Sequence, residues 1–480
     1  MPLEWFLMPV SPARAAAFEI LMRIETTDAY ASEVLHASRF EKLSPSDHGL
    51  LTELVMGVLR WRGVLDNKIA EWSSQSVAKL DGEVLTALRL GTYQILFLDR
   101  VPSHAAVNES VELVKTAHKR SAAGLVNAVL RKIERVSSDL NADLAHPDWL
   151  VDRWARTYGT DAVRKICEYD QTVPRSATRL NITQSNVGTA VPGCPRTADP
   201  HLRMQENTGR EKSRAALDGQ PGTAVPTLFL NELRDEGIQL EPGKVLSTAF
   251  TVKSGDITRS SAFRERRVAL QDEASQLVAL LVGEGKTILD CCAAPGGKTR
   301  IIAERNPEAR VVALELHPQR AALLRKLVPA GNVRVIAGDA RKMPLFETFD
   351  RILVDAPCSG TGTLARNPEI KWRLRPEDLL RLQGYQVEIL QAAMQQVSHG
   401  GRVVYSTCSL EPEENEDVID KVLARDGSFR VVNCGDELEK LRASGEFIWA
   451  GDSVVSGRYL RTIPGVHPCD GFFAAVIARE

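Results

Sequence analysis

The chain has 480 residues, 44% of them hydrophobic and 25% charged, which is the composition of an ordinary globular protein of roughly three domains. Its 60 basic and 62 acidic residues leave a net charge of -2, so any binding of nucleic acid must use local basic patches. The sequence has no apolar run of about eighteen residues and no basic signal-peptide start, so we expect a cytoplasmic protein without a membrane span. None of its eight cysteines stands in a Cys-x-x-Cys pair, so we expect reduced thiols and no metal site.

Residues 11–136 show only helical patterns. Ser11 and Pro12 mark a helix start, and apolar residues recur at helical spacing over the ranges 50–61, 84–97, 106–116 and 123–133. Basic residues gather at 118–120 and 131–135; such clusters are usually solvated helix faces, and nucleic-acid contact is the alternative. We predict a small all-α domain.

Residues 140–268 carry short mixed patterns that predict a small α+β linker domain. Strands fit 179–182 and 249–253, and a helix fits 228–236. The stretch 184–226 has no aromatic residue and is dense in Gly, Pro, Ser and Thr, so we expect a flexible insertion that buries too little to order itself.

From residue 269 to residue 480, strand and helix patterns alternate. Strands fit 287–289, 310–316, 333–337, 351–354, 402–405 and 472–477, and helices fit 298–304, 318–327, 379–396 and 414–424. This alternation is typical of βαβ units, so we predict an α/β domain with a parallel sheet covered by helices on both faces.

The first strand of this domain leads into a loop of small residues and a helix start. The loop runs through Cys292, Ala293, Ala294, Pro295, Gly296, Gly297 and Lys298. It fits neither a dinucleotide-binding loop nor a P-loop, although its glycines allow close approach of a ligand to the main chain. Glu315 and Asp339 end the next two strands, where they could bind a ribose diol and an adenine amino group. A ligand with adenine and ribose but no pyrophosphate indicates S-adenosylmethionine.

Two cysteines follow two further strands. Cys358 stands in Asp355-Ala-Pro-Cys-Ser-Gly, and Cys408 stands in Tyr405-Ser-Thr-Cys-Ser. Strand ends of a parallel sheet share one edge, so one thiol is a candidate nucleophile and the other a candidate proton handler. The alternative is that both thiols are small buried fillers. Sequence alone does not rank the two.

These motifs occur in a recognisable order. The chain resembles the RNA cytosine-5 methyltransferases of the Nol1/Nop2/Sun group, and the helical region resembles the NusB-type RNA-binding domain of its bacterial 16S ribosomal RNA branch, the Sun or Fmu type. The runs that carry the resemblance are 271–275, 290–299, 355–362, 405–409 and 470–473, and in the helical region 105–109 and 124–131.

The resemblance implies a Rossmann-like S-adenosylmethionine-dependent methyltransferase domain and a division of roles among three side chains. Cys408 would add to C6 of the cytosine, Cys358 would act in its release, and Asp355 would bind the base near N3 and the cofactor edge. The related DNA enzymes use a Pro-Cys nucleophile, which Pro357-Cys358 also fits, so reversed roles of the two thiols are the main alternative.

RNA contacts are expected in the loop after Cys358. Arg366, Lys371 and Arg373 are candidates for binding phosphates, and Trp372 could stack on a base or fill core space. The chain departs from the family pattern at the 184–226 insertion and at Ala365, where relatives often carry a second arginine.

We therefore predict an S-adenosylmethionine-dependent methyltransferase that modifies C5 of a cytosine in 16S ribosomal RNA. We expect the protein to be a monomer. We expect its substrate to be RNA that is free or incompletely assembled, because the target base must be unstacked to react. The alternatives are a tRNA or protein methyltransferase, a non-catalytic RNA-binding or antitermination factor, and a thiol redox protein.

Overall fold

In the computed structural model, the described residues are 10–35, 37, 40, 42–73, 75–133, 141–180, 224–345 and 347–480. The chain divides into two compact units, one of Met1–Pro174, Val278–Glu439 and Ala450–Glu480 and one of Arg175–Leu277 and Lys440–Trp449. The helical region and the large sheet thus share one unit. The predicted insertion at 184–226 lies outside the described residues except for 224–226, which begin α10 (Ala224–Asp235).

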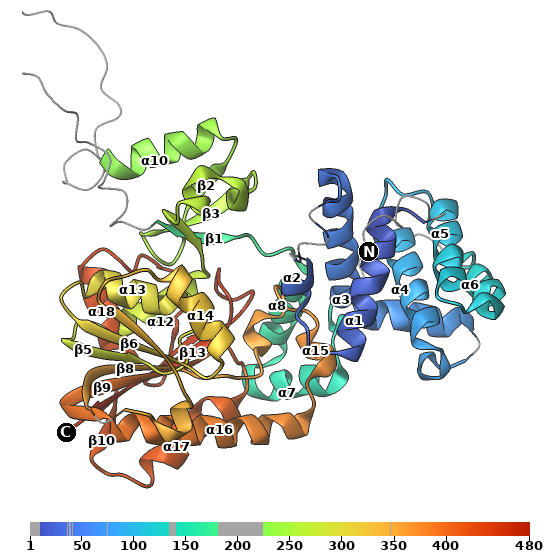
Figure 1. Ribbon diagram of the computed structural model, residues 1–480. Coiled ribbons are helices and arrows are strands. Elements are labelled where there is room, and N and C mark those ends of the chain that lie inside the picture. The colour runs from blue at the N-terminus through green and yellow to red at the C-terminus, as the bar shows by residue number, and fades with distance from the viewer. Residues whose placement is uncertain are drawn as a thin grey trace, which may run out of the picture. The chain divides into compact units, whose positions relative to one another are not determined.

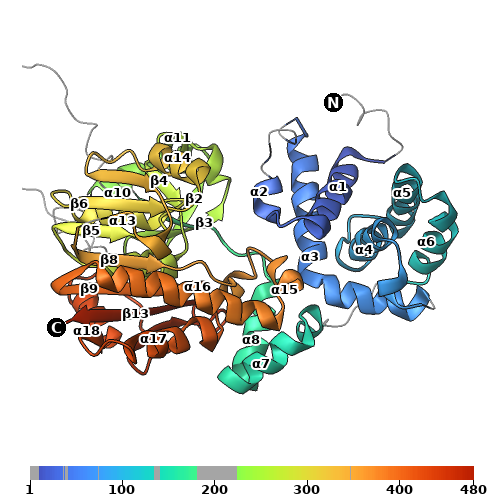
Figure 2. The same cartoon turned by 60° about the horizontal axis from the view of Figure 1, so that its bottom comes forward.

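The N-terminal region is all-helical, as predicted. Its helices bury a continuous core in which residues such as Ile20, Leu54 and Leu88 are fully enclosed, and Figure 2 shows α1, α3, α4, α5 and α6 gathered around it. The helices are α1 (Pro12–Thr26), α2 (Ala31–Leu35), α3 (Pro45–Ser73), α4 (Gly82–Phe97), α5 (Ser103–Thr116) and α6 (Ala123–Leu130).

Two further helices, α7 (Asp148–Tyr158) and α8 (Thr160–Gln171), lie in the part of the chain that the sequence assigned to the linker. Their apolar side chains, including the fully buried Trp154, form one cluster with Leu364 and Leu410. Leu364 and Leu410 belong to the loops that follow the two predicted catalytic cysteines. These helices therefore support the site.

The large sheet has the strand order β11-β12-β13-β9-β8-β5-β6-β7, and β10 pairs with β13. The five strands from β9 to β7 are parallel, as predicted, but β13 is antiparallel to β9, so the prediction of a wholly parallel sheet was wrong at this end. The strands are β5 (Thr287–Asp290), β6 (Arg310–Glu315), β7 (Val333–Ala337), β8 (Phe349–Asp355), β9 (Val397–Thr407), β10 (Phe429–Val432), β11 (Val455–Ser456), β12 (Tyr459–Thr462) and β13 (Phe472–Arg479).

Helices cover both faces of this sheet (Figure 1). Alternate residues of a strand point to opposite faces, so Val312 and Leu314 of β6 belong to the core cluster that contains α16 and α17, whereas Ala313 belongs to the cluster that contains Leu324 of α14. The helices are α13 (Gly297–Arg305), α14 (Pro318–Leu327), α16 (Pro376–Gln395) and α17 (Glu416–Leu423), with α15 (Ile370–Arg373) in the loop before α16. This is the Rossmann-like arrangement that the sequence predicted.

The second unit contains a four-stranded antiparallel sheet in the order β2-β3-β1-β4. Phe229 and Leu233 of α10 are buried in its core together with Ile257 and Val268. Its elements are β1 (Ala177–Leu180), β2 (Gln239–Pro242), β3 (Ala249–Ser254), β4 (Val268–Leu270) and α11 (Ser261–Arg264). A small α+β fold was expected here.

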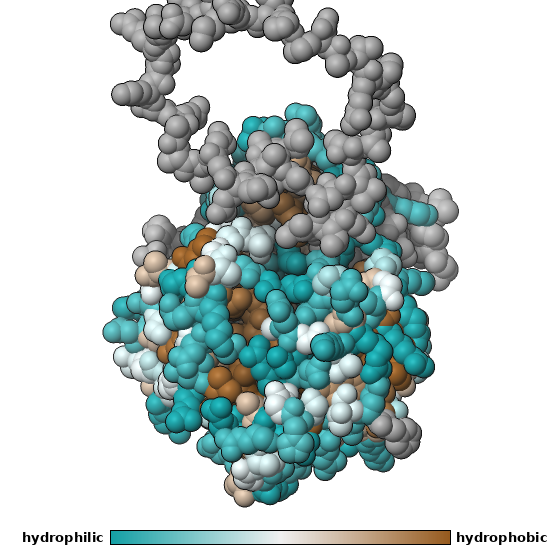
Figure 3. All heavy atoms as spheres, turned by 90° about the vertical axis from the view of Figure 1, so that its left-hand side faces the viewer, coloured by the Kyte–Doolittle hydropathy of each residue, from teal (hydrophilic) through white to brown (hydrophobic). Residues whose placement is uncertain are grey.

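The surface drawn in Figure 3 is mostly hydrophilic, and its hydrophobic atoms form small separate patches. Among the described residues, no helix is both long enough and apolar enough to span a bilayer.

Candidate active site

The parallel strands bring the predicted site residues to one edge of the sheet. Asp290 ends β5, Glu315 ends β6, Asp355 ends β8, and Cys408 follows β9 directly. In an open α/β sheet, ligands bind at the carboxyl ends of the strands, where neighbouring crossovers leave on opposite faces. β5 is flanked by β6 on one side and β8 on the other, so this edge has the topology of a ligand site.

The two predicted catalytic thiols face each other at this edge. The Sγ atoms of Cys358 and Cys408 are 3.4 Å apart, and both side chains are partly buried. The hydrogen bond to Cys408, together with burial, raises the pKa of Cys358 well above its ordinary value. Cys358 therefore holds its proton as long as the Cys408 sulfur is beside it. The buried-filler alternative does not describe such a pair.

A buried carboxylate, Glu414, connects the two cysteine loops. It accepts hydrogen bonds from the main-chain N–H of Ser359 (2.8 Å) and from Gln386 Nε2 (2.9 Å), and the hydroxyls of Ser359 and Ser409 also donate to it. Each serine directly follows one of the cysteines. Burial raises the pKa of Glu414, although these hydrogen bonds oppose the shift. The sequence analysis did not single out this residue, and its only signal was the acidic run 411–414 after the Cys408 motif.

Two glycines cross where the loops meet the C-terminal strand. The Gly362 N–H donates to the Cys408 carbonyl (2.9 Å), and the Gly471 N–H donates to the Gly362 carbonyl (2.7 Å). A Cβ atom on Gly362 would lie 2.2 Å from the Gly471 oxygen, so no larger residue fits without moving one loop. Gly362 thus positions Cys408 through its own main chain.

Asp355 is held from two sides. Ser406 Oγ donates to one of its oxygens at 2.9 Å, and Lys298 Nζ donates to the other at 2.7 Å. Burial acts to lower the pKa of Lys298, but the Asp355 carboxylate outweighs it, and the net shift is upward. Lys298 is therefore a charged partner of Asp355, with its ammonium 5.1 Å from the centroid of the Phe472 ring. It is not an exposed surface lysine.

The predicted cofactor loop requires a glycine at position 296, where it packs against α14 and the residue that follows it. Gly296 has φ +113°, and a Cβ there would meet Leu324 and Val328 at 2.5 and 2.6 Å. α13 begins directly afterwards at Gly297, so its free N–H groups face the loop. Among the described residues, no group of three or more His, Cys, Asp or Glu side chains could hold a metal ion.

The two predicted cofactor carboxylates differ in their surroundings. Glu315 is almost fully buried and accepts from the main-chain N–H groups of His317 (3.1 Å) and Ala294 (3.4 Å), so it is tied to the cofactor loop. Asp339 is paired with Arg341 at 2.7 Å, and this hydrogen bond lowers its pKa. The loop and Glu315 together fit an adenosine ligand held at a helix N-terminus.

The residues predicted to bind RNA phosphate have other partners. Lys371 is 1% exposed and donates to the Arg60 carbonyl (3.0 Å), while Arg373 donates to the carbonyls of Ile24 (2.9 Å) and Ala29 (2.7 Å). Both residues therefore join the helical region to the catalytic domain. Arg366 pairs with Asp470 at 2.7 Å and remains 29% exposed, and it takes part in none of these bonds that join the helical region to the catalytic domain.

Trp372 lies at the same junction. Its Nε1–H donates to the Leu59 carbonyl at 2.7 Å, and the Arg62 guanidinium lies 5.3 Å from its ring centroid. Of the two roles considered for this side chain, packing is the one that this geometry supports. The sequence did not reveal the junction because its contacts join residues about 300 positions apart.

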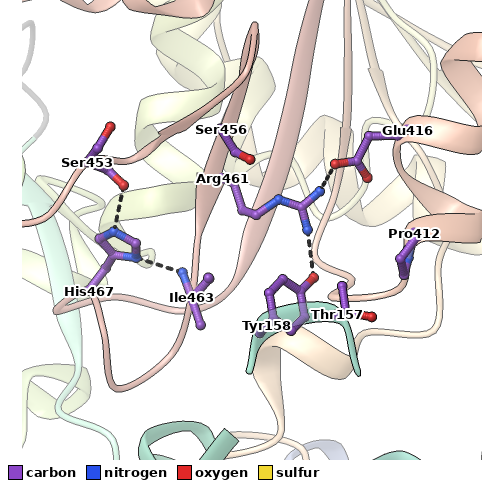
Figure 4. A pocket seen from close by; sticks show the side chains of 9 residues that line it. All are labelled: Thr157, Tyr158, Pro412, Glu416, Ser453, Ser456, Arg461, Ile463 and His467. Atoms are coloured by element: carbon purple, nitrogen blue, oxygen red, sulfur yellow. Dashed lines mark hydrogen bonds and ion pairs between the residues drawn. The ribbon is translucent and has the colours of Figure 1, made fainter. Parts of the chain in front are cut away.

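Helix α7 holds the far side of the Cys408 loop. Trp154 Nε1–H donates to Glu411 (2.9 Å), and the Tyr158 hydroxyl donates to the Leu410 carbonyl. Figure 4 shows Arg461 extending between Tyr158 and Glu416 in a cavity of about 390 Å³ behind this loop. None of the predicted site residues lines that cavity, so the cavity is separate from the site.

Substitution of Gly362 by alanine should destabilise the protein. The new methyl group would overlap the Gly471 main chain, and overpacking of this kind costs about 1–3 kcal/mol. The matched control is Gly384→Ala, in the exposed face of α16 with no atom within 4 Å of the new Cβ, which should stabilise by up to about 1 kcal/mol. Urea unfolding of both variants measures this, and equal effects would contradict the predicted steric constraint.

Asp290 should make stability depend on pH. It is buried and accepts from Thr299 Oγ1 at 2.7 Å, and burial raises its pKa from 3.8 to about 7 despite that hydrogen bond. The folded state therefore binds the proton more tightly than the unfolded state, and stability falls as the pH rises from about 4 to about 7.

Asp290→Asn removes this ionisation. Its stability relative to the wild type should rise between pH 5 and pH 8, by at most about 4 kcal/mol, when urea unfolding is measured without ligand. The exposed Asp426→Asn variant should show no such gain, since the Ser428 hydrogen bond lowers the pKa of Asp426. If the free energy of unfolding of Asp290→Asn differed from that of the wild type by the same amount at both pH values, burial would not raise the pKa of Asp290 as described.

The chain matches two known protein families. Residues 277–478 match the family described as 16S rRNA methyltransferase RsmB/F, and residues 11–135 match the NusB family. A Bacillus subtilis protein named probable ribosomal RNA small subunit methyltransferase B is 33% identical over 98% of this chain and all of its own length. A Vibrio cholerae ribosomal RNA small subunit methyltransferase B is 31% identical over 99% of this chain and 98% of its own.

Solved structures share the fold. The crystal structure of PH0851 has a TM-score of 0.73 at 22% identity, covering 97% of this chain and 98% of that one. A methyltransferase homologue from Pyrococcus horikoshii has a TM-score of 0.52 at 22% identity, covering 72% of this chain and all of that one. With relatives above 30% identity over nearly its full length, this chain belongs to the 16S rRNA methyltransferase RsmB/F family and is an S-adenosylmethionine-dependent RNA methyltransferase.

Proposed function

We propose that this protein methylates C5 of one specific cytosine in 16S ribosomal RNA through a covalent bond between Cys408 and C6 of the base. The observation that carries the proposal is the pair of thiols 3.4 Å apart at the strand-end edge, beside the cofactor loop. The names of the relatives, which specify the RNA of the small subunit, support the choice of substrate.

The chemistry requires a nucleophile because C5 of cytosine does not attack a methyl group unaided. The Cys408 thiolate adds its electron pair to C6, and the C5–C6 double bond becomes an enamine with a nucleophilic C5. Asp355, fixed by Ser406 and Lys298, holds the base at N3. When bound, S-adenosylmethionine would supply the electrophilic methyl group to C5, and Cys292 to Lys298, Glu315, Asp339 and the edge of Asp355 would hold it.

Release of the product requires the C5 proton to leave. While the Cys408 sulfur is free, its hydrogen bond is the largest influence that keeps the Cys358 pKa high. Once that sulfur is bonded to C6 it can no longer carry a negative charge, so the Cys358 thiol gives up its proton to water more readily, and the Cys358 thiolate that results can accept the proton from C5. The electrons of the C5–H bond then restore the C5–C6 double bond, and the Cys408 thiolate leaves.

The target cytosine must be extruded from its stack to reach the thiols, so we propose that the substrate is RNA that is free or incompletely assembled into the subunit. Arg366 is the remaining candidate for a phosphate contact in the loop after Cys358. We place this reaction in the cytoplasm and expect a monomer.

The product identifies the activity. Protein-free 16S RNA from cells that lack this enzyme should gain one 5-methylcytidine when incubated with the wild-type protein and labelled S-adenosylmethionine, as measured by nucleoside analysis after nuclease digestion. Cys408→Ala should lower the rate by at least about 1000-fold, the scale seen when a nucleophile is removed. Cys434→Ala, which removes a buried thiol outside both cysteine loops, should keep most of the activity.

Three outcomes would contradict the proposal. They are a methylated nucleoside other than 5-methylcytidine, methylation of tRNA with none in 16S RNA, and a Cys408→Ala variant as active as the wild type. The second outcome would favour the tRNA alternative.

A further inference from the structure

The loop between α1 and α2, residues 27–30, is fixed on the catalytic domain on both sides of Tyr30. The Ala29 carbonyl accepts from Arg373 Nη2 at 2.7 Å, and the Ala31 N–H donates to Glu369 Oε1 at 3.0 Å. Glu369 directly precedes Ile370, whose Cδ1 atom would lie 2.9 Å from a Cβ atom on Gly360, and Gly360 is two residues after Cys358. A residue of the helical domain is therefore held beside the cysteine loops.

This attachment is buried and specific. Glu369 is 1% exposed, Ala31 is fully buried, and Arg373 makes a second bond, to the Ile24 carbonyl at 2.9 Å. A buried carboxylate is costly unless it is hydrogen-bonded, and burial does raise the pKa of Glu369. Such a contact fixes the position of the main chain at Tyr30, and it does not leave the loop free to move.

The Tyr30 side chain is open to solvent although its main chain is clamped. It is 44% exposed, which makes it one of the few large hydrophobic side chains with that much exposure among the described residues. Burial of its inner part is the main cause that raises the pKa of its hydroxyl, so the phenol is uncharged at neutral pH.

The chemistry at the thiols limits what this ring can contact. A thiolate approaches C6 perpendicular to the plane of the base, and a methyl donor also approaches C5 perpendicular to that plane. Both faces of the target cytosine are therefore used by the reaction. An aromatic ring beside the thiols is left to contact the next base of the same strand, whose face is exposed once the target has been extruded.

Resting on the function proposed above, we propose that Tyr30 stacks on the nucleobase adjacent to the target cytosine and so makes the helical domain part of the substrate site. The clamp by Arg373 and Glu369 sets the position of the ring relative to Cys358. Stacking has little dependence on base identity, so Tyr30 positions the RNA and does not read its sequence.

Kinetics of Tyr30 variants on 16S RNA test this role. Tyr30→Ala should lower kcat/KM for RNA by about 5- to 150-fold, which is the effect of losing one base–aromatic stack. The KM for S-adenosylmethionine should not change. Tyr30→Phe keeps the ring and should stay within about twofold of wild type. Trp72→Ala, which removes a 37%-exposed aromatic side chain at the end of α3 in the same domain, is the matched control and should retain wild-type kinetics.

A short RNA with an abasic nucleotide next to the target, on either side, identifies the partner. If Tyr30 stacks on that base, removing the base should reduce the wild-type rate as much as Tyr30→Ala does, and combining the two should cause little further loss. Multiplicative losses at both neighbouring positions would overturn the proposal. So would a Tyr30→Phe variant as impaired as Tyr30→Ala, or a loss matched by a lower unfolding temperature or weaker cofactor binding.

Failure here is distinguishable from failure of the proposed function. If the wild-type protein forms no 5-methylcytidine in 16S RNA, the function itself is wrong. If 5-methylcytidine is formed normally and the Tyr30 variants behave like the wild type, only the stacking role is wrong.

Discussion

The buried Glu414 carboxylate is the constraint on which the catalytic geometry depends. A carboxylate removed from water must be surrounded by donors, and its donors here are the two serines that follow Cys358 and Cys408, with Gln386 of α16. β8 and β9 are paired up to Asp355 and Ser406, and Glu414 ties together the two loops that leave these strands. The crossing of Gly362 and Gly471 sets the remaining distance, and the thiols meet at 3.4 Å as a consequence.

Hydrogen bonds of buried polar groups also join the helical region to the catalytic domain. Lys371 and Arg373 donate to main-chain carbonyls of α1, α3 and the loop that follows α1, and Glu369 accepts from the start of α2. Lys371 and Glu369 are buried polar groups whose hydrogen-bond partners lie in the other domain, so each domain satisfies groups that the other removes from water. The helical region is thus joined to the segment that follows Cys358, and the same bonds hold the main chain on both sides of Tyr30.

The sequence predicted the elements whose signals are local. Apolar strands followed by Asp290, Glu315, Asp355 and Cys408 predicted that these residues share one edge of the sheet, and the fold confirms this, because parallel strands end on the same side. The sequence did not predict which polar side chains are buried. Lys371 was assigned to RNA because a lysine in a loop is normally exposed, and only the fold shows that it is enclosed. The antiparallel β13 was missed for a similar reason, since strand direction is set by connections through β10 to β12 that show little periodicity of their own.

The proposed mechanism assigns different roles to the two thiols, with Cys408 as the nucleophile and Cys358 acting in product release. A trapped intermediate tests this assignment directly. Cys358→Ala is expressed in cells and purified under denaturing conditions, and any RNA that remains attached is sequenced. We predict a covalent adduct at a single cytosine of 16S RNA, which disappears when Cys408→Ala is added. Trapping by Cys408→Ala with none by Cys358→Ala would reverse the two roles and contradict this account.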